Sequence, residues 1–159
     1  MTANDAGYRR IGTGFHYEDL SIGMTFRTAG RTLTQADLSN FCNLTWMTEE
    51  LFTDADHRAD MALPAAVVPG ALVYAFAEGL LLPMMQGTGL AFLEADVRVK
   101  GPTVVGDTLT VYCEVSEMRV TSRGDRGLVR TFNSVRRSDG TELLTYNPLR
   151  MLKLRGGWV

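Results

Sequence analysis

Cysteine and histidine are both scarce in this chain. Its 159 residues include two cysteines, Cys42 and Cys113, and two histidines, His16 and His57. Neither cysteine has a second cysteine at the CxxC spacing of a zinc or redox site. The sequence therefore predicts no metal and no other cofactor, and the two cysteines are expected to be free thiols in a reducing cytoplasm.

A strong charge of either sign and a long unbroken apolar run are also missing. A formal net charge of -2 and a pI near 5.7 give no general reason to expect nucleic acid or an anionic membrane as a partner. The longest apolar stretch, residues 65–85, is interrupted by two prolines, two glycines and Glu78. Such a stretch fits a buried helix better than a membrane span. The first ten residues are small and polar, unlike a signal peptide, so we predict a cytoplasmic protein.

Basic residues are concentrated in the last quarter of the chain. They are Arg119, Arg123, Arg126, Arg130, Arg136, Arg137, Arg150, Lys153 and Arg155. One interpretation is that these residues form the solvated face of strands and a charged turn. The other is that they form a rim that meets the phosphates of a ligand. The sequence leaves both interpretations open.

The first third of the chain predicts a tail, a strand and a helix. Residues 1–15 are expected to form a flexible tail, and residues 16–159 a single domain. Residues 24–32 alternate loosely enough for a first strand. Thr34 is placed to cap the following helix, and Asp37 lies in its first turn, where a negative charge suits the helix dipole.

The rest of the chain predicts one long helix followed by strands. Residues 70–82 are apolar nearly all round, so we expect a helix that other structure wraps. Pro69 suits the first turn of this helix and Pro83 its end. Strands joined by tight turns are predicted over residues 92–100, 108–118, 128–137 and 143–154. These elements describe an α+β fold in which a curved antiparallel β-sheet wraps around a long central helix.

Four segments of the chain carry a resemblance to a known family. They are residues 17–24 (YEDLSIGM), 31–37 (RTLTQAD), 67–70 (VVPG) and 96–109 (DVRVKGPTVVGDTL). In this order they resemble the F-E-D-L-x-V-G, R-T-[IV]-T-E-x-D, I-A-H-G and F-x-x-P-V-x-x-G-D-T-L segments of the MaoC-like dehydratases, the (R)-specific enoyl-CoA hydratase family. The resemblance spans residues 15–154, and it implies the hot-dog fold.

The loop at residues 43–54 (NLTWMTEELFTD) is similar to the active-site loop of that family, roughly G-L-T-G-D-x-N-P-x-H-x-D. In the family, the Asp and the His of this loop share the proton transfers of hydration. Aligned without gaps, this chain has Met47 at the Asp position and Phe52 at the His position. Hydration needs a base that activates water and an acid that protonates the α-carbon, and neither of these side chains transfers a proton. The resemblance thus implies an acyl-thioester ligand without the usual catalytic pair.

The resemblance also implies where such a ligand would bind. Gly70 matches the start of the central helix, whose backbone N–H holds the thioester oxygen, and a helix N-terminus suits an oxyanion. The phosphates of CoA are expected near Arg98 and Lys100. The predicted substrate pocket is formed by Trp46, Met47, Phe52, Val68 and Pro69. The alternative is that the Met and aromatic side chains of the loop only fill core volume.

Other acid–base groups lie close to the vacated positions. Glu49 stands where the family has Asn, Asp54 where the family also has an acidic residue, and His57 follows in a short helix predicted over residues 55–62. In one interpretation these are ordinary helix-turn carboxylates and a surface histidine. In the other, Glu49, Asp54 and His57 form a replacement catalytic group.

Three functions remain open from the sequence. The leading hypothesis is a MaoC-like protein that binds an acyl-CoA or acyl-carrier thioester with a degenerate catalytic pair, as the non-catalytic subunit of a heteromeric hydratase. The second is an active acyl-CoA hydratase or lyase with non-standard residues. The third is a hot-dog thioesterase, which would need a carboxylate on the central helix, such as Glu78. Because an open edge strand is a liability, we expect a homodimer or a heterodimer with another hot-dog chain.

Overall fold

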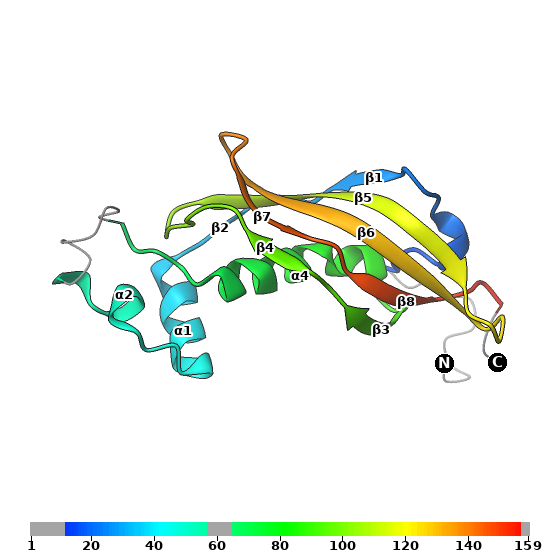
Figure 1. The fold of residues 1–159 in the computed structure, drawn as a ribbon, viewed down its shortest axis with the longest axis horizontal. Helices are drawn as coiled ribbons and strands as arrows, with labels where there is room; N and C mark the ends of the chain where they lie inside the picture. Colours follow the sequence, from blue (N-terminus) through cyan, green and yellow to red (C-terminus); the bar gives the residue numbers. More distant parts are fainter. Residues whose placement is uncertain (1–11, 57–64, 157–159) are drawn as a thin grey trace.

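A curved antiparallel β-sheet covers one side of the long helix α4 (Gly70–Met85) in the computed structural model (Figure 1). The structure describes residues 12–56 and 65–156. Within these residues the sheet has eight strands: β1 (Thr25–Arg27), β2 (Arg31–Thr32), β3 (Gly89–Glu94), β4 (Val97–Val99), β5 (Thr108–Val120), β6 (Arg126–Arg137), β7 (Glu142–Tyr146) and β8 (Leu149–Lys153). The predicted α+β fold with an antiparallel sheet and a central helix is confirmed.

Three of the predicted strands are each divided into two short ones. β1 and β2 both pair with β5, and β7 and β8 both pair with β6, while β4 pairs with β7 and β3 with β8. The prediction of unbroken strands over residues 24–32, 92–100 and 143–154 is therefore wrong. Pro148 has no N–H for a sheet ladder, which accounts for the break between β7 and β8.

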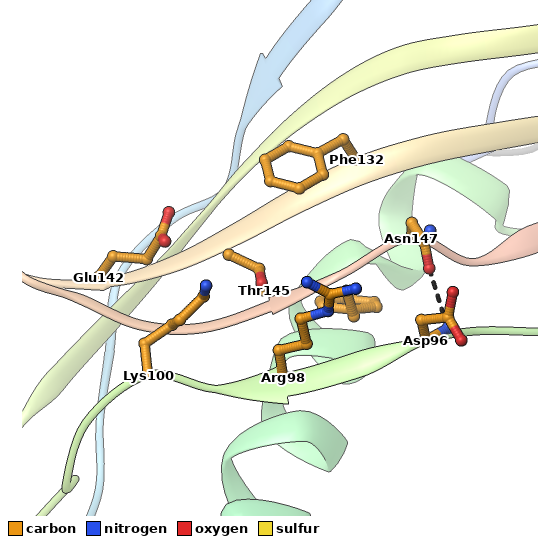
Figure 2. A pocket seen from close by; sticks show the side chains of 8 residues that line it. Asp96, Arg98, Lys100, Phe132, Glu142, Thr145 and Asn147 are labelled. Atoms are coloured by element: carbon orange, nitrogen blue, oxygen red, sulfur yellow. Dashed lines mark hydrogen bonds between the residues drawn. The ribbon is translucent and has the colours of Figure 1, made fainter.

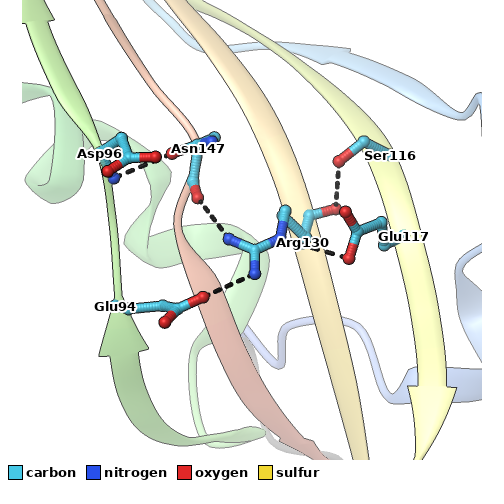
Figure 3. A network of polar contacts seen from close by, with 6 residues as sticks. All are labelled: Glu94, Asp96, Ser116, Glu117, Arg130 and Asn147. Carbon is cyan, nitrogen blue, oxygen red and sulfur yellow. Dashed lines mark hydrogen bonds and ion pairs between the residues drawn. The ribbon is translucent and has the colours of Figure 1, made fainter.

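Two of the interruptions, between β3 and β4 and between β7 and β8, lie near Arg130 of β6, which contacts three of its neighbours (Figure 3). Its guanidinium donates to Glu94 at the end of β3 (2.6 Å), to Glu117 of β5 (3.3 Å) and to the carbonyl of Asn147 between β7 and β8 (3.1 Å). β5 has a bulge between Val115 and Glu117, beside the same arginine. Bulges and breaks let a sheet bend. Arg130 thus joins the strands where the sheet curves around α4.

The predicted start of the first helix is confirmed. Thr34 precedes α1 (Gln35–Thr45), and its Oγ1 accepts the N–H of Asp37 (3.2 Å) while Asp37 accepts the N–H of Thr34 (2.9 Å). The bonds from Thr34, helped by the charge of Arg31, hold the pKa of Asp37 below its usual value. The short helix η2 (Tyr17–Asp19) precedes β1. α1 and α2 (Glu50–Thr53) lie beyond one end of the sheet (Figure 1).

Helix α4 continues to Met85, past its predicted end at residue 82. Pro83 lies inside the last turn, so the prediction that it ends the helix is wrong. A proline this close to a helix end removes only one backbone hydrogen bond, and the turn persists. Pro69 precedes the helix as its N-cap and does not belong to the first turn. Neither α4 nor another helix of the described part of the chain is long and apolar enough to cross a membrane.

The sheet covers only one side of α4 in the single chain. The buried residues of the helix are Leu72, Val73, Ala77 and Leu81. On the other side Ala71, Ala75 and Gly79 are exposed, and Leu82 is 55% exposed. The prediction that the helix is wrapped all round is therefore wrong for the isolated chain. One curved sheet reaches one face of a helix, and an apolar second face needs another structure to cover it.

The segment before η2 is attached to the end of α4. The N–H of Gly14 donates to the carbonyl of Gln86 and the N–H of Phe15 to that of Met84, both at 2.8 Å. These two residues belong to the predicted tail and are bound to the domain. Residues 1–11 of the predicted tail lie outside the described residues.

Candidate functional site

The loop that resembles the family's active-site loop begins with a tryptophan in an unusual conformation. Trp46 ends α1 with φ 61°, in the left-handed region that disfavours residues with a side chain. The family pattern has glycine at this position, so the loop keeps a glycine-type turn although the residue has changed. The Trp46 side chain is 87% exposed and does not line a pocket in the single chain, so its predicted pocket role stays a prediction.

Met47 and Phe52 occupy the positions of the family's Asp and His, and both pack on the core. Each side chain is half-buried and contacts the main hydrophobic cluster, in which Leu38 of α1 and Leu72 of α4 are buried. This contact supports the interpretation that they fill core volume. It also leaves no ionisable group at either position.

Glu49 and Asp54 of this loop make local hydrogen bonds, Glu49 through its backbone carbonyl and Asp54 through its carboxylate. Glu49 precedes α2, and its carbonyl accepts the N–H of Phe52 (2.9 Å) and the hydroxyl of Thr53 (3.1 Å). Asp54 ends α2, and its carboxylate accepts the N–H of Asp56 (2.8 Å). Both side chains are exposed. His57 lies outside the described residues, so the proposed group of three stays a prediction.

A cavity of about 160 Å³ lies beside the start of α4. Val68 and Gly70 line it, together with Val99 of β4 and Leu144 of β7. A Cβ atom at position 70 would come within 2.8 Å of a methyl group of Val99, so any side chain here requires the Val99 side chain or β4 to shift. None of the described residues that line the cavity is ionisable, and none comes from the loop at 43–54. The cavity can hold an acyl group but offers it no acid or base.

Arg98 and Lys100 lie on the opposite side of β4 from this cavity. They line a hollow of about 290 Å³ on the outer face of the sheet, with Phe132, Glu142 and Thr145 (Figure 2). Side chains alternate between the faces of a strand, so Val99 points toward Gly70 while Arg98 and Lys100 point away from it. Within residues 12–56 and 65–156 we find no ion pair for either cation.

Most of the basic residues near the C-terminus are paired within the chain. Arg130, Arg137 and Arg155 form ion pairs with Glu94, Asp107 and Asp19, respectively. Arg126 lies 3.6 Å from Asp125. These contacts favour the structural interpretation of this group over a phosphate-binding rim.

Glu78 of α4, the carboxylate that a thioesterase would need, is paired with Arg150 of β8. The Arg150 side chain is only 7% exposed. A carboxylate whose oxygen is engaged by a guanidinium is less accessible to a substrate than a free one. The structure therefore gives no support to the thioesterase hypothesis.

Both cysteines are buried and free. Burial raises the pKa of the Cys113 thiol to about 11, and burial also raises the pKa of Cys42. Cys42 belongs to the main hydrophobic core. Among the described residues no group of His, Cys, Asp and Glu side chains is placed to hold a metal ion.

Known proteins resemble the chain in fold and, weakly, in sequence. No family model matches it. The (R)-specific enoyl-CoA hydratase of Rhodospirillum rubrum is 23% identical over 101 residues, which cover 64% of this chain and 69% of that protein. A MaoC-like dehydratase structure from the same organism has a TM-score of 0.78 at 18% identity, covering 89% of this chain and 99% of the other.

A protein of Mycobacterium tuberculosis with a double hot-dog fold has a TM-score of 0.82 at 23% identity. The match covers 95% of this chain and 47% of that one, so this chain corresponds to about one of its two halves. This chain has the hot-dog fold. This chain is also similar to the HadBC (3R-hydroxyacyl-ACP dehydratase) complex of M. tuberculosis. The TM-score is 0.70 at 19% identity, and the match covers 82% of this chain and 96% of the other. The predicted resemblance to MaoC-like hot-dog proteins is confirmed.

The raised pKa of Cys113 predicts how stability depends on pH. Between pH 9, the usual value, and about pH 11, the folded state keeps the thiol proton that the unfolded state releases. The free energy of unfolding should therefore fall as the pH rises through this window, by roughly 1–3 kcal/mol from this group. Urea denaturation at several pH values measures the fall. A Cys113→Ala variant should show a smaller fall than wild type, and an equal fall in both would contradict the assignment.

Proposed function

We propose that this chain binds an acyl thioester at the start of α4 and lacks the acid–base pair with which MaoC-like hydratases add water. The observation that carries the proposal is the packing of Met47 and Phe52 on the hydrophobic core, at the two positions where the family has Asp and His. The apolar cavity beside Gly70 supports it, because it can take an acyl group next to the N-terminus of a helix.

The absence of the acid–base pair predicts that this chain hydrates an enoyl thioester very slowly. Each acid or base contributes about 10²–10⁴-fold to a rate, so the loss of both costs several orders of magnitude. A chain of this kind can still serve as the non-catalytic subunit of a heteromeric hydratase that shapes the acyl site of a competent partner. The likeness to the HadBC complex is consistent with such an assembly. The exposed positions of Glu49 and Asp54 give no support to a replacement catalytic group.

Hydration of crotonyl-CoA tests this proposal. The purified chain alone should show no turnover, or turnover far below the ordinary enzyme range of about 1–10³ per second. The absorbance of the enoyl thioester measures the reaction. Activity at ordinary rates would show that the degenerate-site proposal is wrong, and Asp54→Ala and His57→Ala variants would then reveal whether these residues had replaced the pair.

Two additions to the same assay separate the possible roles. A Met47→Asp/Phe52→His double variant should gain measurable activity if the loop still has the geometry of the family, and circular dichroism checks that the variant folds.

The addition of a second hot-dog chain with an intact Asp and His should produce activity that exceeds the activity of that chain alone. No gain over the partner alone would count against the subunit role.

The CoA carrier is proposed to place its phosphates near Arg98 and Lys100. These cations have no ion pair in the described part of the chain, and only β4 separates their hollow from the cavity at Gly70.

An Arg98→Ala/Lys100→Ala variant should bind acyl-CoA about tenfold more weakly or worse, because charge-assisted hydrogen bonds contribute about 1.5–3 kcal/mol each. Its affinity for the same acyl group on pantetheine, which has no nucleotide, should be unchanged. Calorimetry measures both, with Arg119→Ala as the matched control for the loss of an exposed arginine. Equal affinities for acyl-CoA in variant and wild type would contradict the proposal that the CoA phosphates bind near Arg98 and Lys100.

The open edge of the sheet supports association with a second hot-dog chain. On β3 and β4 the large apolar side chains are between 41 and 62% exposed: Leu90, Phe92, Leu93, Val97 and Val99. Next to them the apolar face of α4 is also uncovered. An apolar edge of this kind marks an interaction surface.

We therefore expect a dimer or a larger assembly. Light scattering should give a mass of at least twice the 17.5 kDa of one chain. A Val97→Lys/Val99→Lys variant should shift the mass toward one chain, because lysine on an edge strand opposes pairing. A Val120→Lys variant, which changes an exposed apolar residue at the end of β5, is the control and should leave the mass unchanged. A wild-type mass near 17.5 kDa at working concentration, with or without a second hot-dog chain, would contradict this expectation.

A further inference from the structure

A group of polar side chains is buried between α4 and the inner face of the sheet, where apolar packing would be expected. Arg150 donates to Glu78 of α4 and to the hydroxyl of Thr131 (3.3 Å). Beside them lie Asn133 of β6 and Tyr146 of β7, which are partners across the two strands. We call these five residues the polar cluster. They come from four different elements, so the fold and not local sequence brings them together.

By hydrogen-bond geometry, three atoms of the polar cluster lack a partner within the described residues, although Glu78 and Asn133 lie close enough to the Tyr146 hydroxyl for both to affect its pKa. The three atoms are the Oδ1 and Nδ2 atoms of Asn133 and the hydroxyl oxygen of Tyr146. Asn133 is 0% exposed and Tyr146 is 1% exposed, so solvent does not reach either residue. Buried polar atoms are almost always paired, and an unpaired one costs about 1–3 kcal/mol. The amide of Asn133 and the hydroxyl of Tyr146 therefore have hydrogen-bonding capacity that their neighbours do not fill with good geometry.

One buried water does not explain these atoms. A cavity of about 10 Å³, which has room for about one water, adjoins Arg150 and Thr131. Neither Asn133 nor Tyr146 lines this cavity. A water there would bond to the arginine side of the polar cluster and leave the amide and the phenol unpaired.

The polar cluster lies further along α4 than the proposed thioester site, because Glu78 follows Gly70 by eight residues. Gly70, Tyr74 and Glu78 are spaced by four residues, so they lie on one stripe of the helix over about 12 Å. The ring of Tyr74 meets that of Tyr146 edge to face, with centroids 5.1 Å apart. Tyr74 beside the polar cluster and Glu78 within it are both partly exposed, so this is the side of the cluster nearest to solvent. An acyl chain that starts at Gly70 and follows this stripe reaches the polar cluster.

We propose that the polar cluster binds a hydroxyl or carbonyl group on the far part of the acyl chain. This inference rests on the proposed function, and it narrows the ligand to acyl thioesters that carry oxygen along the chain, in preference to plain fatty acyl groups. The amide of Asn133 supplies an acceptor and a donor, and the hydroxyl of Tyr146 supplies a second donor. The Tyr74 ring turns aside to admit the group.

Charge in the polar cluster favours a neutral group over a carboxylate. The Arg150–Glu78 pair is already neutral overall, and a further buried charge would lack a counter-ion. Burial and then the negative charge of Glu78 raise the pKa of Tyr146, so its hydroxyl keeps its proton and can donate.

Calorimetry with matched ligands tests the proposal on the full chain as purified. Octanoyl-CoA to dodecanoyl-CoA would be compared with their ω-hydroxy counterparts. Wild type should bind the best hydroxylated ligand about tenfold tighter than its plain counterpart, because a site built to bond a hydroxyl penalises a ligand that lacks it. Tyr146→Phe and Asn133→Leu should each lower this ratio toward one while the affinity for the plain ligand stays the same or rises. Tyr112→Phe, on the outer face of the sheet, should leave the ratio unchanged.

Thermal unfolding separates this role from a structural one. The two variants remove unpaired polar atoms with little change of shape, so they should melt at the same or a higher temperature than wild type. Equal binding of hydroxylated and plain ligands by wild type would overturn the inference while the proposed function stands. Variants that melt lower and keep the wild-type ratio would overturn it as well. If no acyl-CoA binds, the proposed function fails and this inference fails with it.

Discussion

The curvature of the sheet around α4 is the constraint on which the other features depend. A flat sheet could not follow the helix, and this sheet bends through a bulge in β5 and breaks in its outer strands. Arg130 spans that bend with bonds to three neighbours. The ion pairs involve exposed carboxylates and each contributes little, about 0–1 kcal/mol. Their value lies in holding these strands in one arrangement.

Patterns that depend on neighbouring residues were predictable from the sequence. The alternation in β5 and β6, the cap at Thr34 and the long apolar helix all follow from local chemistry. The strand breaks and the continuation of α4 through Pro83 were not predictable, because they depend on how the sheet bends and on what packs against the helix end. The open second face of α4 was missed because an apolar helix has the same sequence whether its own chain or a partner covers it.

Part of the candidate site was likewise predictable from the sequence, and part was not. The loss of ionisable groups at Met47 and Phe52 is evident from the letters alone, but their packing on the core is known only from the structure. The polar cluster was not predicted from the sequence, because its members come from distant parts of the chain. A signal was present in β6, where period-two alternation puts Thr131 and Asn133 at positions that face inward. Two polar residues in succession on an inner face are a sign of a buried polar function.

The contact between Val99 and Gly70 joins two events that are usually considered separately. Val99 belongs to the edge strand that a second chain would meet, and it also forms a wall of the cavity at the start of α4. In the proposed assembly, a shift of β4 on association would change that cavity, and a ligand that fills the cavity would in turn press on β4. By thermodynamic linkage, assembly and ligand binding would then alter each other's affinity by the same factor. The close contact at position 70 would thus couple the edge of the sheet to the ligand site.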